Sequence, residues 1–94
     1  MRVIRSFRGS DAERLFRGTV PRRLASVARV AQRKLTQLHA ATTLEDLAIF
    51  PGNRLEPLRG DRRGQYSIRV NDRLRVCFRW EDGDAFEVEI VDYH

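Results

Sequence analysis

The chain has 94 residues, of which 41% are hydrophobic and 33% charged, and its formal net charge is +5. This length suits a single domain spanning residues 1–94 with one modest core, and the composition excludes wholesale disorder. No apolar run approaches the roughly 20 residues of a membrane span, and the short, charged start of the chain lacks the features of a signal peptide.

The first elements are predicted to be a weak strand and a short helix. Residues 2–7 alternate Val3, Arg5 and Phe7 with Arg2, Ile4 and Ser6, a pattern typical of a strand. Ser10 and Glu13 match a capping box, in which a hydroxyl and a carboxylate satisfy free amides at a helix start. A short helix should follow and end near Gly18.

A longer helix is predicted after Pro21, a residue that suits a first helical turn. Its apolar residues follow the spacing of an amphipathic stripe: Leu24, Val27, Ala28, Ala31, Leu35 and Leu38. Its basic residues should fall mainly on the outer side: Arg22, Arg23, Arg29, Arg33 and Lys34. Thr42 and Glu45 match a second capping box and predict a further short turn of helix.

From Arg54 onward the pattern favours strands. We expect strands at residues 55–58, 65–70, 74–80 and 86–90, with a glycine-bounded basic loop at residues 59–64. In the third of these strands apolar residues alternate with Arg75, Cys77 and Arg79, which indicates one face in the core and one face outward. Because Arg75 is assigned to the outward face, we expect its removal to leave no core cavity. The fold class is therefore α+β, in the order β-α-α-β-β-β-β, with two helices on one face of a mostly antiparallel sheet.

The apolar faces also constrain the strand register. A three-residue connection at residues 71–73 pairs Ile68 with Val76, whereas a two-residue turn would mix the two faces. A three-residue loop at residues 82–84 likewise pairs Val76 with Ile90 and Phe78 with Val88. Arg75 then lies opposite Val91 and diagonal to Tyr93. This alternation does not place Asp92 and His94 on the face of Arg75, so they reach it only if the tail leaves the sheet.

Charge is unevenly distributed along the chain. Residues 1–54 contain 11 basic and 4 acidic residues, whereas residues 55–94 contain 7 basic and 9 acidic ones. A basic chain favours nucleic acid, the ribosome or an acidic protein as partner, although an arginine-rich solvated helix surface would give the same count. The lone Cys77 cannot form an internal disulfide, which fits a reducing cytoplasm.

The second half of the chain resembles the HigB toxins of bacterial toxin–antitoxin systems, members of the RelE-like superfamily. The resemblance rests on the segments at residues 53–68, 71–80 and 88–94, which include a Leu-x-Pro-Leu-Arg-Gly-Asp run and a terminal Asp-Tyr-His. It implies a ribosome-dependent mRNA endonuclease that is held inactive by a HigA-like antitoxin with a helix-turn-helix DNA-binding fold. DNA would be contacted only through that antitoxin, and no membrane is involved.

The resemblance also assigns roles to individual residues. By position, Asp92, Tyr93 and His94 match the catalytic tail, and Arg75 matches the active-site arginine. Further RNA or phosphate contacts are expected from Arg59, Arg62 and Arg73. One departure concerns Glu56, since some family members have histidine there; Glu56 is left as an accessory base or a surface charge.

The same residues suit the chemistry on general grounds. Cleavage of RNA through its own 2′-hydroxyl needs a base, an acid and cations around the phosphorane. The imidazole of His94 serves either proton-transfer role at neutral pH, and Asp92 is either the base or the group that orients His94. An arginine fork such as that of Arg75 pairs with two phosphate oxygens. The sequence offers no credible metal cluster, so we expect no metal or other cofactor.

Each of these residues also has a plainer interpretation. Arg75 would equally serve as a cross-strand partner of Glu89, Tyr93 as sheet packing, and His94 as a solvated chain end. A RelE-fold module that binds RNA, ribosome or antitoxin without cutting is the alternative function. A basic DNA-binding domain is weaker, because no recognition helix follows a tight turn.

Overall fold

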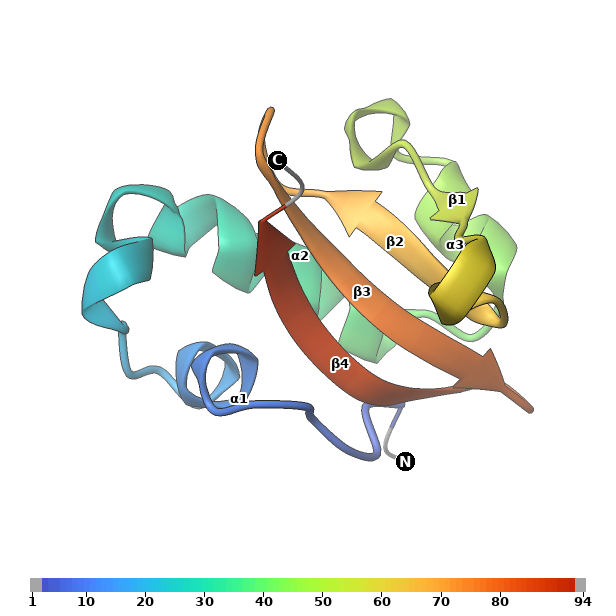
Figure 1. Cartoon of the computed structure of the whole chain (residues 1–94), viewed down its shortest axis with the longest axis horizontal. Coiled ribbons are helices and arrows are strands. Elements are labelled where there is room, and N and C mark those ends of the chain that lie inside the picture. The colour runs from blue at the N-terminus through green and yellow to red at the C-terminus, as the bar shows by residue number, and fades with distance from the viewer. Residues whose placement is uncertain (1–2, 93–94) are drawn as a thin grey trace.

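A computed structural model describes residues 3–92 as a four-stranded antiparallel sheet with the longest helix behind it (Figure 1). The strand order is β1-β2-β3-β4, so each strand pairs with its neighbour in the chain. The predicted α+β class, with helices preceding the sheet, is confirmed. The helical elements are α1 (Asp11–Phe16), 3₁₀ helix η1 (Arg22–Val27), α2 (Ala28–Ala40), α3 (Leu44–Ala48), 3₁₀ helix η2 (Pro51–Asn53) and 3₁₀ helix η3 (Gly60–Arg62). The strands are β1 (Glu56–Pro57), β2 (Gln65–Arg69), β3 (Leu74–Glu81) and β4 (Asp84–Asp92).

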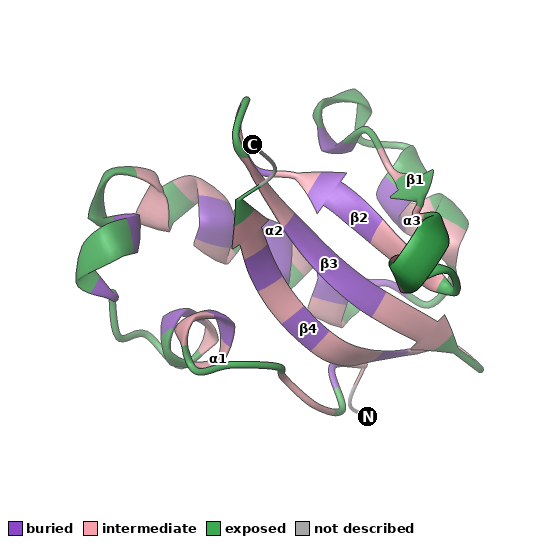
Figure 2. Ribbon diagram, in the orientation of Figure 1, coloured by how far each residue is buried: buried purple, intermediate pink, exposed green. Residues whose placement is uncertain are grey.

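The core lies between α2 and the sheet. Figure 1 shows α2 running behind β3 and β4, and Figure 2 shows buried residues along the middle of the sheet and on the facing side of the helix. Leu35 and Leu38 from α2 are fully buried, as are Val76 and Phe78 from β3. No helix between residues 3 and 92 is long and apolar enough to cross a membrane.

The predicted first strand is wrong as a continuous ladder. Residues 3–8 run parallel to β4 and form two separate bridges, Ile4 with Ala85 and Phe7 with Val88. Between the two bridges, Glu87 has a positive φ of 55° and its amide donates to Ser6 Oγ at 2.9 Å. This bulge in β4 interrupts the edge that a continuous strand would need.

Both predicted capping boxes differ from the structure. Ser10 is the N-cap of α1, but its side chain makes no capping hydrogen bond; Glu13 instead pairs with Arg17 at 3.2 Å. The second box is shifted by one residue, because Thr43 and Asp46 cap α3. The hydrogen bonds from Thr42 and Thr43 hold the pKa of Asp46 below its ordinary value.

The predicted register of β2 and β3 is confirmed, since Ile68 pairs with Val76. The next connection is only in part as predicted. Val76 pairs with Ile90, but the turn has two residues, Asp82 and Gly83, with φ angles of 53° and 82°. Positive φ at both positions is the requirement of a tight hairpin turn. The residue absent from the turn reappears as a register shift between Cys77 and Arg79, so Phe78 is not paired with Val88 as expected.

Candidate active site

The face of the sheet turned away from α2 carries a row of polar residues. Ser67 of β2 lies opposite Cys77 of β3, which lies opposite Glu89 of β4. The next row consists of Arg69, Arg75 and Val91. The predicted outward position of Arg75, opposite Val91, is therefore confirmed.

Arg75 is nevertheless held tightly by its surroundings. Its Nε donates to Ser67 Oγ at 2.7 Å and its Nη2 donates to the carbonyl oxygen of Arg54 at 2.7 Å. The same Nη2 lies 3.6 Å from Glu56 Oε1, and the side chain is only 12% exposed. The interpretation of Arg75 as the partner of Glu89 is wrong, because Glu89 pairs with Arg62 and Arg75 lies near Glu56. The guanidinium thus links β3 to β2 and to the segment before β1.

The other residues predicted around this face lie along β1 and η3. Figure 1 shows η3, in yellow, in front of the β1–β2 edge of the sheet. From η3, Arg62 donates to Glu89 Oε2 at 2.9 Å and to Gln65 Oε1 at 3.0 Å, so it spans the face. Arg59 and Glu56 are both exposed. Part of the predicted basic loop therefore packs on the outer face of the sheet through Arg62, whereas Arg59 is exposed to solvent.

Two arginines for which the sequence predicted no role lie beside Arg75. An open pocket of about 360 Å³ is lined by Arg54, Arg69, Arg75, Asn71 and Asp72. The predicted register carries a signal for Arg69, because pairing Ile68 with Val76 also places Arg69 opposite Arg75. No sequence signal places Arg54 there, since its position depends on the turn between η2 and β1.

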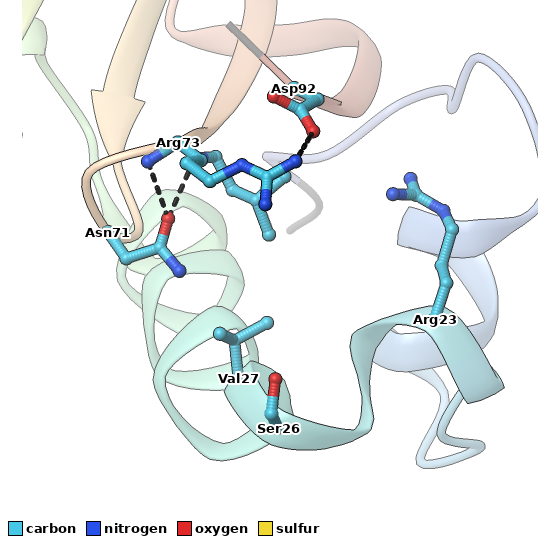
Figure 3. Close-up of a pocket in the computed structure, with 7 residues that line it drawn as sticks. Arg23, Ser26, Val27, Asn71, Arg73 and Asp92 are labelled. Carbon is cyan, nitrogen blue, oxygen red and sulfur yellow. Dashed lines mark hydrogen bonds and ion pairs between the residues drawn. The ribbon is translucent and has the colours of Figure 1, made fainter. Parts of the chain in front are cut away.

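Asp92 and Arg73 meet at a different pocket. Arg73 Nη2 lies 2.8 Å from Asp92 Oδ2, and both line an open pocket of about 320 Å³ with residues of η1 (Figure 3). Asp92 is opposite Leu74, so it lies on the side of the sheet that faces the helices, away from Arg75. The strand alternation predicted this difference of faces. Asn71 lines both pockets, and its Oδ1 accepts from the amides of Arg73 and Leu74.

Tyr93 and His94 lie outside the described residues. The structure therefore brings together Arg75 and Glu56 on one face, and Arg73 and Asp92 at the adjacent edge. Among residues 3–92, no three histidine, cysteine, aspartate or glutamate side chains are grouped so that they would hold a metal ion.

Two solved structures with a similar fold are those of toxins. One is a YoeB/ParE toxin from Agrobacterium tumefaciens, with a TM-score of 0.52 and 21% identity over 97% of both chains. Another is a YoeB dimer from Staphylococcus aureus, with a TM-score of 0.55 and 16% identity over 98% of both chains. At these identities the likeness concerns the fold alone.

Sequence comparison then gives the family. Residues 5–94 match the model of the HigB-like toxins, described as RelE-like toxins of the type II toxin–antitoxin system HigB. The chain therefore belongs to the HigB-like toxin family, and the resemblance seen in the sequence is confirmed.

Two curated proteins that are similar in sequence also carry the name HigB. Toxin HigB-1 of Vibrio cholerae is 48% identical over 61 residues, which are 65% of this chain and 64% of that protein. Endoribonuclease HigB of Proteus vulgaris is 44% identical over 41 residues, which are 44% of this chain and 45% of that protein. The matches thus span less than two thirds of either relative.

Proposed function

We propose that this protein is the toxin of a type II toxin–antitoxin system and acts in the cytoplasm as a ribosome-dependent mRNA endonuclease. The observation that carries the proposal is the polar face around Arg75, which belongs to a chain of the HigB-like family. The relative from Proteus vulgaris that bears the name endoribonuclease supports RNA as the substrate. Proton transfer by side chains, without a metal ion, is the chemistry that these residue types offer.

The proposed roles follow from residue chemistry. His94 exchanges a proton with the 5′-oxygen or the 2′-hydroxyl, and Asp92 acts as the base or orients His94. Tyr93 stacks on a base or orients the phosphate. Arg75 neutralises the charge that develops on the phosphorane. Arg73, Arg59 and Arg62 are proposed to guide the RNA backbone, and Glu56 is proposed to restrain the Arg75 fork, as its distance of 3.6 Å from Nη2 supports.

The edge of the sheet near Asn71 is the proposed meeting point of these groups. Asn71 lines the pocket of Arg75 and also the pocket of Asp92. A phosphate placed at this edge would be reached by Arg75 from one face and by Asp92 from the other. In our proposal the ribosome aligns the mRNA with these groups, because it holds the mRNA in a geometry that the isolated protein does not impose.

We expect the purified protein to cut mRNA on translating ribosomes and to leave the same RNA largely intact when it is free. The reason is that the described groups occupy two faces of a sheet edge, so that a flexible substrate is poorly aligned. The measurement compares cleavage of one labelled mRNA with and without ribosomes. Efficient cutting of free RNA by protein that contains no other nuclease would contradict the ribosome requirement. No cutting in either case would favour the binding module without catalysis.

We also propose a HigA-like antitoxin with a helix-turn-helix fold as partner, contacting α1, η1 and α2. Exposed arginines cluster on these elements, among them Arg14, Arg22, Arg29 and Arg33. An acidic segment of the antitoxin would complement this charge. We expect the double change Arg29→Glu and Arg33→Glu to weaken co-purification of the neighbouring gene product at least tenfold, whereas Arg59→Glu should not. Equal recovery with both variants would place the antitoxin elsewhere.

A further inference from the structure

We propose that Arg54 and Arg69 form a second phosphate-binding site, which takes the phosphodiester of single-stranded RNA next to the one held by Arg75. This inference rests on the proposed function, because it assumes that RNA crosses the outer face of the sheet. It adds two residues to the site and a second phosphate beside the one held by Arg75.

The first argument is the shape and lining of the pocket. Three arginines from three elements converge on one open space of about 360 Å³: Arg54 follows η2, Arg69 ends β2, and Arg75 lies in β3. This volume lies near the lower end of pockets that hold small ligands, roughly 300 Å³ and above. Guanidinium groups pair bidentately with phosphate oxygens, which makes a phosphodiester the anion of best fit.

The second argument concerns charge. Among residues 3–92, Asp72 is the one carboxylate that lines this pocket, and it is ion-paired with Arg69. Glu56, which belongs to β1, places its Oε1 atom 3.6 Å from Arg75 Nη2. Between residues 3 and 92 no carboxylate lies within ion-pair distance of the Arg54 guanidinium. In the part of the chain that the structure describes, this pocket is therefore lined by three arginines and one carboxylate.

The third argument is that the backbone holds Arg54 in place. Arg54 has a φ of 46°, a left-handed conformation that non-glycine residues adopt rarely. Its carbonyl oxygen accepts the hydrogen bond from Arg75, and the preceding Asn53 is fully buried and hydrogen-bonded to Leu47 and Gln37. Such unusual conformations persist where the surroundings enforce them and concentrate at ligand sites. The Cα of Arg54 is thus fixed at the rim, with an exposed side chain.

The fourth argument is that Arg69 is available for exchange. Asp72 is 92% exposed in its pair with Arg69, and ion pairs of this kind contribute little net stability. A phosphodiester carries one negative charge and offers two non-bridging oxygens, as a carboxylate does, so it can take the place of Asp72 on the guanidinium when Arg54 holds it as well. In this proposal Asp72 is an exposed counterion of Arg69 that the RNA phosphate replaces.

The test measures binding of the full chain to a fluorescent single-stranded RNA whose 2′-positions are all O-methylated, so that it cannot be cut. Affinity is measured by anisotropy over a range of potassium chloride concentrations. Log affinity falls with log salt, and for single strands each lost phosphate contact makes this slope less steep by about 0.7. For Arg54→Ala and for Arg69→Ala we expect a salt dependence that is less steep by about 0.7. Each variant should also bind the RNA about tenfold more weakly at low salt. Arg54→Lys should keep the slope and recover part of the affinity.

The matched control is Arg29→Ala, which removes the same charge from an exposed position on α2 that does not line this pocket. Thermal melts of all variants establish that they are folded. Slopes for Arg54→Ala and Arg69→Ala equal to that of Arg29→Ala would overturn the inference, as would a wild-type protein that does not bind the oligonucleotide at low salt. Because the RNA cannot be cut, these outcomes are independent of whether the protein is a nuclease. A lost slope in a protein that never cuts mRNA would retain the site and reject the proposed catalysis.

Discussion

Arg75→Ala is expected to abolish toxicity and also to lower the stability of the fold. Loss of a preorganised cation at a phosphorane costs on the order of 10²–10³ in rate. The alternation alone predicts an exposed residue whose loss the fold tolerates, but the side chain is 12% exposed and donates to Ser67 and to the Arg54 carbonyl. Removing a charged donor from such acceptors costs about 1–3 kcal/mol of unfolding free energy. Growth inhibition and a urea unfolding curve, measured for each variant, check both parts.

Two further variants separate the chemical role of Arg75 from its structural one. Ser67→Ala removes the acceptor of the Nε hydrogen bond at a fully buried position and leaves the guanidinium in the protein. It should lose stability yet keep most of its toxicity. Arg75→Lys should recover toxicity only in part, because an ammonium lacks the bidentate fork. If Ser67→Ala is as inactive as Arg75→Ala at equal stability, Arg75 acts on the fold and not on the phosphate.

Asn53→Ala is expected to produce the largest loss of stability, about 3 kcal/mol of unfolding free energy. Asn53 is fully buried, accepts from Lys34 Nζ, and donates to Gln37 Oε1 and the Leu47 carbonyl, both at 3.1 Å. Its loss leaves the buried Lys34 ammonium without this acceptor. Burial, first of all, and the neighbouring Arg33 and Arg69 charges already lower the pKa of Lys34 below its ordinary value of 10.5.

The pH dependence of this loss identifies the lysine as its cause. A lysine whose pKa is lowered in the folded state releases its proton there first, so stability rises with pH between the folded pKa and 10.5. The defect of Asn53→Ala should therefore be smaller at alkaline pH than at neutral pH. Asn71→Ala is the control, because Asn71 caps a partly exposed turn and should cost only about 1 kcal/mol. A defect in Asn53→Ala that does not change with pH would exclude the Lys34 charge.

The sheet was largely predictable because alternation and register are linked. Once Ile68 and Val76 must share the core face, every pair between β2 and β3 follows. The bulge near Glu87 was not predictable, because a two-residue turn plus one inserted residue gives the same pairing of Val76 with Ile90 as a three-residue turn. The same bulge separates the two bridges of residues 3–8. It therefore accounts both for the interrupted first strand and for the register shift between β3 and β4.

The sequence did not predict the position or burial of residues that depend on tertiary contacts. Lys34 was assigned to the outer side of its helix, yet it is 7% exposed, because α3 and η2 bring Asn53 against that side of α2. Arg54 enters the pocket through a turn that no periodicity describes. For Arg75 the face was predictable, but its burial was not, since β1 and the segment before it contribute the covering groups.

The most direct test of ribosome-dependent mRNA cleavage is induced expression in living cells followed by mapping of new mRNA 5′ ends. Wild type is compared with Arg75→Ala, with a deletion of His94, and with Arg29→Ala as the control of equal charge change. The proposed function predicts new 5′ ends inside translated regions for wild type and Arg29→Ala, and their loss in the other two and after translation is blocked. New ends that persist when translation is blocked, or in Arg75→Ala, would contradict it.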